Sequence, residues 1–149
     1  MSFLYDEAAK ELFQGHIELD AATIKVLLVD ADTTADTERT AANLGAFTDL
    51  SEADGAGYAR QTLANQAVAF DAGTKKVSLT ADATTFTIGA NTSTEQNVAA
   101  LVYVDRGGAG SDLPLLFIDD GGFPVTPVGQ TFEITWSADG LLSGEIIAS

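Results

Sequence analysis

The sequence predicts an all-β protein: a β-sandwich or jelly roll of about eight short antiparallel strands, with a short helix at the N-terminus. Two observations support this fold class. Short segments rich in β-branched and aliphatic residues recur from residue 23 onward, and turn residues separate them at intervals of about 8–12 residues. The chain has 149 residues, the usual size of one domain. We therefore predict one domain over residues 1–149, with a helical arm at 1–15 and the sandwich at 16–149.

The helix is predicted over Leu4–Gln14. Leu4, Ala8 and Leu12 recur at helical spacing, so they share one face. Gly15 follows directly, and glycine commonly ends helices because it adopts a left-handed backbone conformation at little cost. The apolar stripe is narrow, so this helix is expected to pack on a larger element or on a neighbouring subunit.

The strands are predicted from short apolar or alternating segments bounded by turn residues. Val98–Asp105 and Leu113–Asp119 are the most apolar and flank a glycine-rich turn, so we expect a central hairpin that is buried on both faces. Thr131–Trp136 alternates between apolar and polar residues, as a half-buried strand does. The remaining predicted strands are Thr23–Val29, Tyr58–Leu63, Ala67–Asp71, Lys76–Leu79 and Thr85–Ile88, with Leu141–Leu142 and Ile146–Ile147 closing the chain.

A long polar connection is predicted at residues 30–57, with one apolar island at Leu44–Leu50. Connections of this length inside a compact domain are usually functional or partly disordered. We therefore expect this segment and the N-terminal helix to be the parts most free to reach neighbouring molecules.

The charge balance is strongly acidic. Seven Lys and Arg face 22 Asp and Glu, for a formal net charge of −15. Binding to nucleic acid or to an anionic membrane rests on clustered cations, and the largest basic grouping here is the pair Lys75–Lys76. The sequence therefore predicts neither nucleic acid nor membrane as a partner. No apolar stretch is long enough to span a membrane and no secretory signal is visible, so synthesis in a host cytoplasm is expected.

Catalytic chemistry is poorly supported by the residue types present. The chain has no cysteine and one histidine, His16, with no G-x-S-x-G turn to supply a serine nucleophile. A glycosidase would need paired carboxylates in a cleft lined by aromatic residues, and the single Trp136 stands in an alternating strand typical of a core position. The glycine stretches at 55–57 and 107–110 match no phosphate-binding motif and indicate tight turns. We predict no enzyme and no cofactor.

Because carboxylates are abundant, calcium is the metal whose binding is worth considering. Asp30, Asp32 and Asp36 lie close in sequence, and Asp119–Asp120 precede two glycines. Neither cluster matches the EF-hand pattern, and an acidic chain must carry solvated acids in its loops. Solvated loop acids are therefore the favoured interpretation, and no metal site is predicted.

Several stretches, in the same order and over nearly the whole chain, resemble a family of small bacteriophage virion proteins, the capsid decoration or cement (head auxiliary) proteins. Each motif is nonspecific when taken alone. The stretches are the helix that ends at Gly15, TIKVLLVD at 23–30, EADGAGYAR at 52–60, VYVD at 102–105, LPLLFID at 113–119 and ITWSADGL at 134–141.

The resemblance implies a structural protein that coats the capsid exterior of a virion, binds the major capsid protein and assembles with itself, most often as a homotrimer. It assigns no functional residue. From the residues themselves we predict capsid or subunit contacts in three places, namely the N-terminal segment (Phe3, Leu4, Tyr5, Leu12), one side of a predicted strand (Tyr58, Arg60), and a loop (Phe123, Pro124). Arg60 is also placed to pair with a carboxylate across strands. The alternatives are a phage tail or fibre component and a carbohydrate-binding module of the virion.

Overall fold

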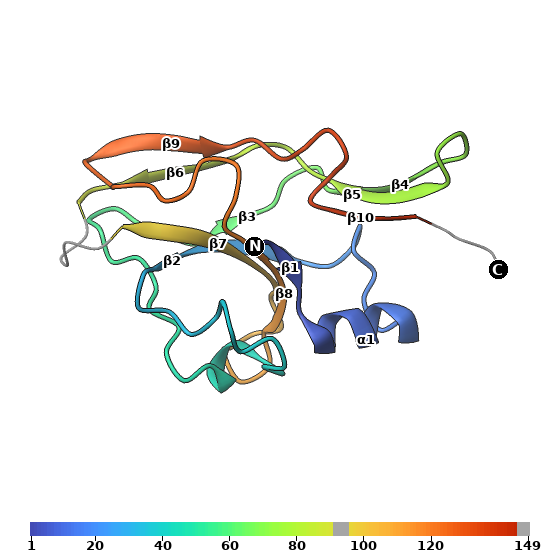
Figure 1. Ribbon diagram of the computed structural model, residues 1–149, viewed down its shortest axis with the longest axis horizontal. Coiled ribbons are helices and arrows are strands. Elements are labelled where there is room, and N and C mark those ends of the chain that lie inside the picture. The colour runs from blue at the N-terminus through green and yellow to red at the C-terminus, as the bar shows by residue number, and fades with distance from the viewer. Residues whose placement is uncertain (91–95, 146–149) are drawn as a thin grey trace.

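The computed structural model describes residues 1–90 and 96–145, and the predicted strand at Ile146–Ile147 lies outside them. The protein is mostly β, with 36% of its residues in strands and 9% helical, and its strands form several antiparallel sheets. The sheets lie in two layers, with a single α-helix and a long loop beneath the lower layer (Figure 1). The all-β class with one short N-terminal helix is therefore confirmed.

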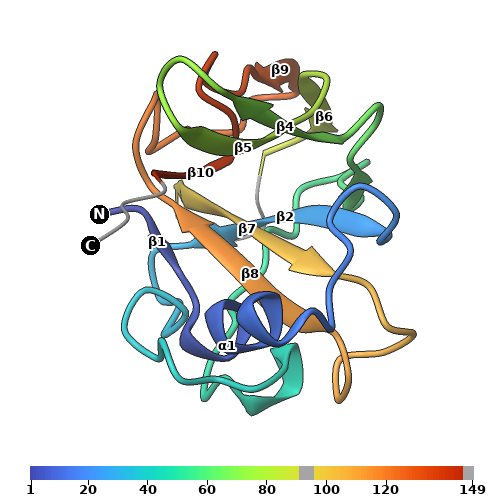
Figure 2. The same ribbon diagram turned by 90° about the vertical axis from the view of Figure 1, so that its right-hand side faces the viewer.

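The lower layer is a five-stranded antiparallel sheet in the order β1-β8-β7-β2-β3. Its centre is the hairpin of β7 (Asn97–Val104) and β8 (Leu113–Ile118), in which nearly every residue is buried. β2 (Ile24–Asp30) pairs along β7, while β1 (Phe3–Leu4) and β3 (Gln61–Thr62) are short edge strands. The predicted central hairpin is confirmed. It is buried on both faces because the upper strands cover one side and the helix and long loop cover the other (Figure 2).

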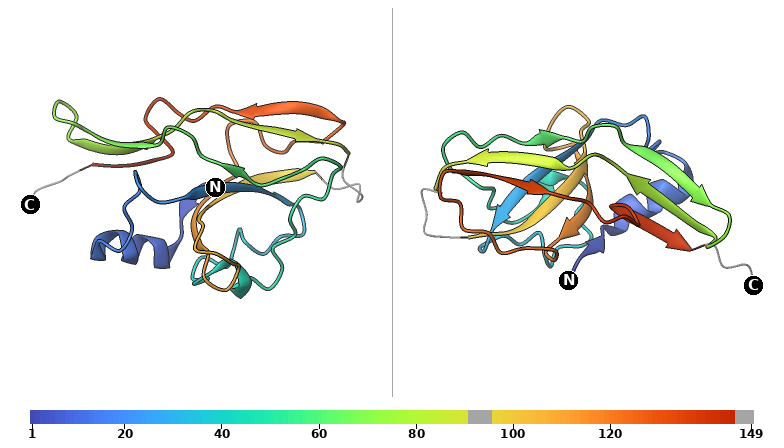
Figure 3. Two further views of the ribbon diagram at one scale, coloured as in Figure 1. Left: turned by 180° about the vertical axis from the view of Figure 1, so that it is seen from behind. Right: turned by 90° about the horizontal axis from the view of Figure 1, so that it is seen from above.

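The upper layer contains two smaller sheets. One has the order β10-β5-β4, with β4 (Ala67–Asp71), β5 (Lys76–Thr80) and β10 (Leu142–Glu145). The other pairs β6 (Thr84–Ile88) with β9 (Gln130–Ile134). Alternate residues of β6 face the core, and Phe86 stacks on Phe132 with ring centroids 5.5 Å apart. Seen from above, the strands of this layer cross over the lower sheet (Figure 3).

The N-terminal helix begins later than its apolar spacing predicts. α1 spans Asp6–Gln14, while Leu4 lies in β1, opposite Leu116 of β8. The prediction of helix from Leu4 was wrong because pairing with β8 satisfies this backbone, and the Tyr5 N–H donates to Leu115 O at 3.0 Å. The predicted end is confirmed, since Gly15 adopts φ 72° and its N–H returns to the last turn of the helix.

The long connection between β2 and β3 is packed against the protein. It contains the 3₁₀ helix η1 (Leu44–Ala46) and buries five apolar side chains, namely Ala35, Ala41, Leu44, Phe47 and Ala53. Its backbone is bonded to distant segments, as in Leu44 N–H to Asp112 O at 2.9 Å and Asp6 N–H to Arg39 O at 3.1 Å. The expectation that this loop is free to reach neighbours is therefore wrong. Its apolar residues are scattered along the sequence and find partners only in the folded chain.

Glu38 holds two parts of this loop together, because its carboxylate accepts hydrogen bonds from Thr48 N–H and Thr34 Oγ1, each at 2.7 Å. These bonds, led by those from Thr48, lower the pKa of Glu38 below its usual value. A lowered pKa contributes stability at pH above the unfolded value, about 4, that is lost as pH falls through the folded value. We expect Glu38→Gln to lower the melting temperature at pH 7 and the difference from wild type to close below about pH 4. Melting curves from pH 7 to 3 test this, and a difference that stays constant with pH would contradict it.

Candidate interaction surface

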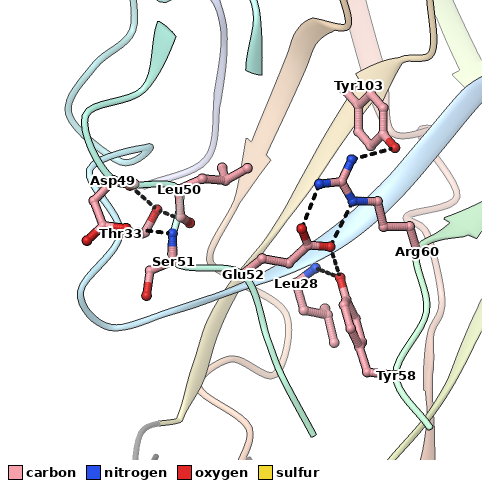
Figure 4. Close-up of polar contacts among 9 residues, drawn as sticks. All are labelled: Leu28, Thr33, Asp49, Leu50, Ser51, Glu52, Tyr58, Arg60 and Tyr103. Atoms are coloured by element: carbon pink, nitrogen blue, oxygen red, sulfur yellow. Dashed lines mark hydrogen bonds and ion pairs between the residues drawn. The ribbon is translucent and has the colours of Figure 1, made fainter. Parts of the chain in front are cut away.

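Tyr58 and Arg60 come together on a single carboxylate, that of Glu52 (Figure 4). The Tyr58 hydroxyl donates to Glu52 Oε1 at 2.8 Å. The Arg60 guanidinium donates to both carboxylate oxygens, from Nε to Oε1 at 2.8 Å and from Nη2 to Oε2 at 2.6 Å. Arg60 also donates to the Tyr103 hydroxyl at 3.2 Å. The prediction that both residues lie on a strand was wrong, because β3 begins only at Gln61.

Tyr58 and the backbone next to Glu52 supply hydrogen-bond partners for the part of the β2 edge that β3 does not reach. The Leu28 N–H donates to the Tyr58 hydroxyl at 3.0 Å, the Ala53 N–H donates to Leu28 O at 3.0 Å, and the Asp30 N–H donates to Ser51 O at 2.8 Å. Burial raises the pKa of the Tyr58 hydroxyl well above its usual range, and the nearby Glu52 raises it further. The hydrogen bond to Glu52 likewise raises the pKa of Arg60. The charge of Arg60 is thus neutralised within the chain, and the cluster acts as an internal brace.

The predicted N-terminal contact residues have different environments. Tyr5 is fully buried (0% exposed), with its hydroxyl donating to Ala35 O at 2.7 Å, so its side chain offers no surface in this fold. Phe3 is partly buried, stacked on Phe117 and covered by the Arg39 guanidinium. Leu4 and Leu12 are partly exposed, and both line the groove described next.

An uncharged groove of about 450 Å³ lies between α1 and the β10-β5-β4 sheet. α1 borders it on one side and the sheet on the other (Figure 1). Phe13, one of its lining residues, is 96% exposed. Besides Ser78, Ser143 and Gly144, the lining is apolar and defines what we call the apolar groove: Leu4, Leu12, Phe13, Leu19, Val68, Val77, Leu79 and Leu142.

The groove explains residues that the sequence analysis did not select. Phe13 lies outside the Leu4–Ala8–Leu12 stripe of the predicted helix. An aromatic residue outside the apolar stripe of a helix is the sequence signal that could have indicated this surface. Exposed apolar side chains that gather in one place mark interaction sites in soluble proteins. The groove is therefore the strongest candidate for an interaction surface on the described part of the chain.

A second hollow, of about 720 Å³, lies beside β9 and is lined by Phe123, Phe132 and Trp136 together with Asp120 and Ser137. Trp136 Nε1 is buried and has no hydrogen-bond partner among the described residues. Pro124 does not belong to this hollow and lines a separate one together with Asp36. The predicted pair Phe123–Pro124 is thus divided between two places on the surface.

The remaining candidates form no assembled centre in residues 1–90 and 96–145. His16 is exposed and its backbone N–H caps the helix by donating to Glu11 O at 2.9 Å. Asp32 and Asp36 are exposed, and no group of three or more metal-ligating side chains is placed to hold an ion in the described residues. No helix in this part of the chain is long and apolar enough to cross a membrane.

Comparison of the chain with protein-family models, with curated proteins and with solved structures finds no match in any of the three.

Proposed function

We propose that this chain is a structural virion protein, a bacteriophage capsid decoration or cement protein that binds the head exterior and stabilises the shell. Its two layers would then belong to a β-sandwich of the jelly-roll type. The major capsid protein is the proposed partner, together with further copies of this chain, for which the sequence resemblance implies a trimer.

The observation that carries this proposal is the apolar groove. A chain of net charge −15 keeps Phe13 almost fully exposed beside an uncharged hollow, and such a feature has a free-energy cost in water unless a partner covers it. Two exposed acidic residues, Glu18 and Asp20, flank the lining residue Leu19 in the sequence. The groove therefore fits an apolar side chain of the capsid subunit flanked by cations, which would give complementary charge around an apolar centre.

The test is co-sedimentation with undecorated phage heads, scored for saturation at a fixed ratio and for a higher melting temperature of the heads. Covering a Phe side chain contributes about 1.5–3 kcal/mol, so Phe13→Lys is expected to weaken binding at least about tenfold. Val128→Lys is the matched control, because Val128 is also exposed (63%) and lies outside the groove. Equal binding by the two variants would remove the groove from the contact, and no binding by wild type would end the proposal.

Two alternatives remain, each with its own outcome. A tail or fibre component would form rings or tubes and would not saturate heads. A carbohydrate-binding module is favoured by one observation, the hollow with Phe123, Phe132 and Trp136 beside Asp120, since aromatic faces and carboxylates suit sugars. Binding of wild type to a glycan array, with loss in Trp136→Ala, would support that module.

A further inference from the structure

β4 is an exposed edge strand without the usual protection. It lies at the end of the β10-β5-β4 order, pairs regularly with β5 over all five residues, and every one of its side chains is exposed. Natural edge strands are normally blunted by Lys, Pro, a bulge or very short length. The sequence Ala67–Asp71 (AVAFD) has no Lys, Pro or bulge, and its one charged residue, Asp71, stands at its end. Figure 3 shows its outer side free of other elements.

One face of this edge is apolar. Val68 and Phe70 are 44% and 55% exposed, and their separation by one residue places them on the same face. They stand opposite Leu79 and Val77 of β5, so the face continues into the apolar groove. Backbone donors and acceptors therefore border a row of uncovered apolar side chains, the combination that strand addition uses.

We propose that β4 pairs antiparallel with β4 of a second copy of this chain, about a two-fold axis at Ala69. In this register Val68 lies opposite Phe70 of the partner subunit, and Phe70 opposite the partner's Val68. Aromatic and β-branched residues are favourable cross-strand neighbours. A two-fold contact uses the same surface on both subunits, so a second copy of this chain supplies the matching strand.

The charges permit this register despite the acidity of the chain. Asp71 lies opposite Ala67 of the partner subunit, which separates the two Asp71 carboxylates by about 14 Å at about 3.4 Å per residue, beyond the screening length of about 8 Å. The register also brings the hairpin turn with Lys75 alongside the residues that precede the partner's Ala67. There the partner's Asp82 is held by its own Asn65, at 2.6 Å within each chain.

Lys75 is available for an ion pair with the partner's Asp82. Within residues 1–90 and 96–145, four other cationic side chains form ion pairs with Glu7, Asp105, Glu52 and Glu11. Arg39 lies over the Phe3 ring, and Lys76 stands opposite Asp71 in the β4–β5 pair. Lys75 is exposed in the turn and makes no such contact in this part of the chain. The two-fold axis would produce this pair twice, once at each end of the joined strands.

The dimer is expected to be weak, because pairing five residues buries less than the roughly 1,200 Å² of a stable interface. Net repulsion between two copies of charge −15 opposes it. Raising NaCl from about 50 to about 500 mM is therefore expected to strengthen association, since added salt screens the repulsion. Sedimentation velocity over a concentration series measures this.

The register is tested by cross-linking, for which the chain is suited because it has no cysteine. Ala69→Cys places two thiols opposite each other across the axis, where Cβ atoms are about 4.5–5.5 Å apart, and is expected to form a disulfide dimer on mild oxidation. Thr74→Cys, in the turn far from the axis, is the control. Ala69→Cys is expected to cross-link at least about tenfold faster, and equal rates for the two variants would overturn the register.

Two substitutions test the side chains. Phe70→Lys is expected to weaken the dimer at least about tenfold with an unchanged melting temperature, because Phe70 is already half exposed. Lys75→Glu is expected to weaken it several-fold, and adding Asp82→Lys to restore it. Failure to restore in a folded double variant would remove the Lys75–Asp82 pair, while a monomer at all concentrations, or trimers without dimers, would overturn the proposal.

This inference does not depend on the virion role. Phe70 lies outside the groove lining, so Phe70→Lys is expected to keep saturable head binding while losing the dimer. Phe13→Lys is expected to lose head binding and keep the dimer. The two proposals therefore fail through different variants and in different assays.

Discussion

Replacing Gly55 by alanine is expected to lower the free energy of unfolding by about 3 kcal/mol, the upper range for overpacking. A Cβ at Gly55 would collide with Gly89 O and stand 2.7 Å from Ile88 Cγ1. The first of these is backbone at the end of β6, which cannot rotate away as a long side chain does. Gly89 is in turn bonded through its N–H to Ala56 O at 2.7 Å, so the two segments are joined where the collision occurs.

Urea unfolding of Gly55→Ala and Gly110→Ala measures this effect with a matched control. Gly110 lies in the β7–β8 turn with open space where a Cβ would stand, so its replacement is expected to stay within about 0.5 kcal/mol of wild type. A similarly small change in Gly55→Ala would mean that residues 55–57 do not pack on the end of β6. The predicted turn at residues 55–57 is confirmed, since the Tyr58 N–H donates to Gly55 O at 3.0 Å and Gly57 adopts φ 80°. Gly55 has a second role that its sequence did not predict, a close approach between two segments.

Replacing Tyr5 by alanine is expected to cost about 3–5 kcal/mol, as for other large aromatic core residues. Tyr5 is fully buried, and its ring meets those of Phe3 and Phe47 edge to face, with centroids 5.1 and 5.7 Å away. Its hydroxyl reaches across to Ala35 O in the long loop. One side chain thus joins the N-terminal segment, the loop and the lower sheet.

Tyr5→Phe separates the hydroxyl from the ring. It keeps the packing and leaves the Ala35 carbonyl without this donor, so about 1–2 kcal/mol is expected to be lost. The side chain is buried, so this variant is also expected to bind phage heads as wild type does. Weaker head binding by a folded Tyr5→Phe would show that Tyr5 takes part in the contact, as the sequence analysis predicts. It would also contradict a purely internal role for this side chain.

Local pattern alone was sufficient for the central elements. The runs at Val98–Asp105 and Leu113–Asp119 are apolar at nearly every position, and only a strand covered on both sides accommodates such a run at this length. Gly15 ends the helix because few other residues adopt its backbone conformation at low cost. These features depend on neighbours in sequence, so spacing and residue type determine them.

Local pattern was insufficient wherever the deciding partner lies far along the chain. Leu4 belongs by spacing to the helix, yet it joins β1 because β8 offers a free edge. Tyr58 and Arg60 alternate like strand residues, yet both turn to Glu52, because β2 has unpaired groups that Tyr58 and the neighbouring backbone satisfy. In each case a distant backbone edge supplied hydrogen bonds that outweighed local preference.

The sequence by itself determined the strand periods, the end of the helix and the central hairpin, because each follows from burial or backbone freedom within one element. Only the tertiary structure decided which surfaces stay uncovered. The apolar groove and the face of β4 exist because the β10-β5-β4 sheet extends past the lower sheet (Figure 1), leaving Phe13, Val68 and Phe70 exposed. An apolar residue has the same periodicity whether or not another layer covers it, so its exposure depends on how far the opposing layer reaches.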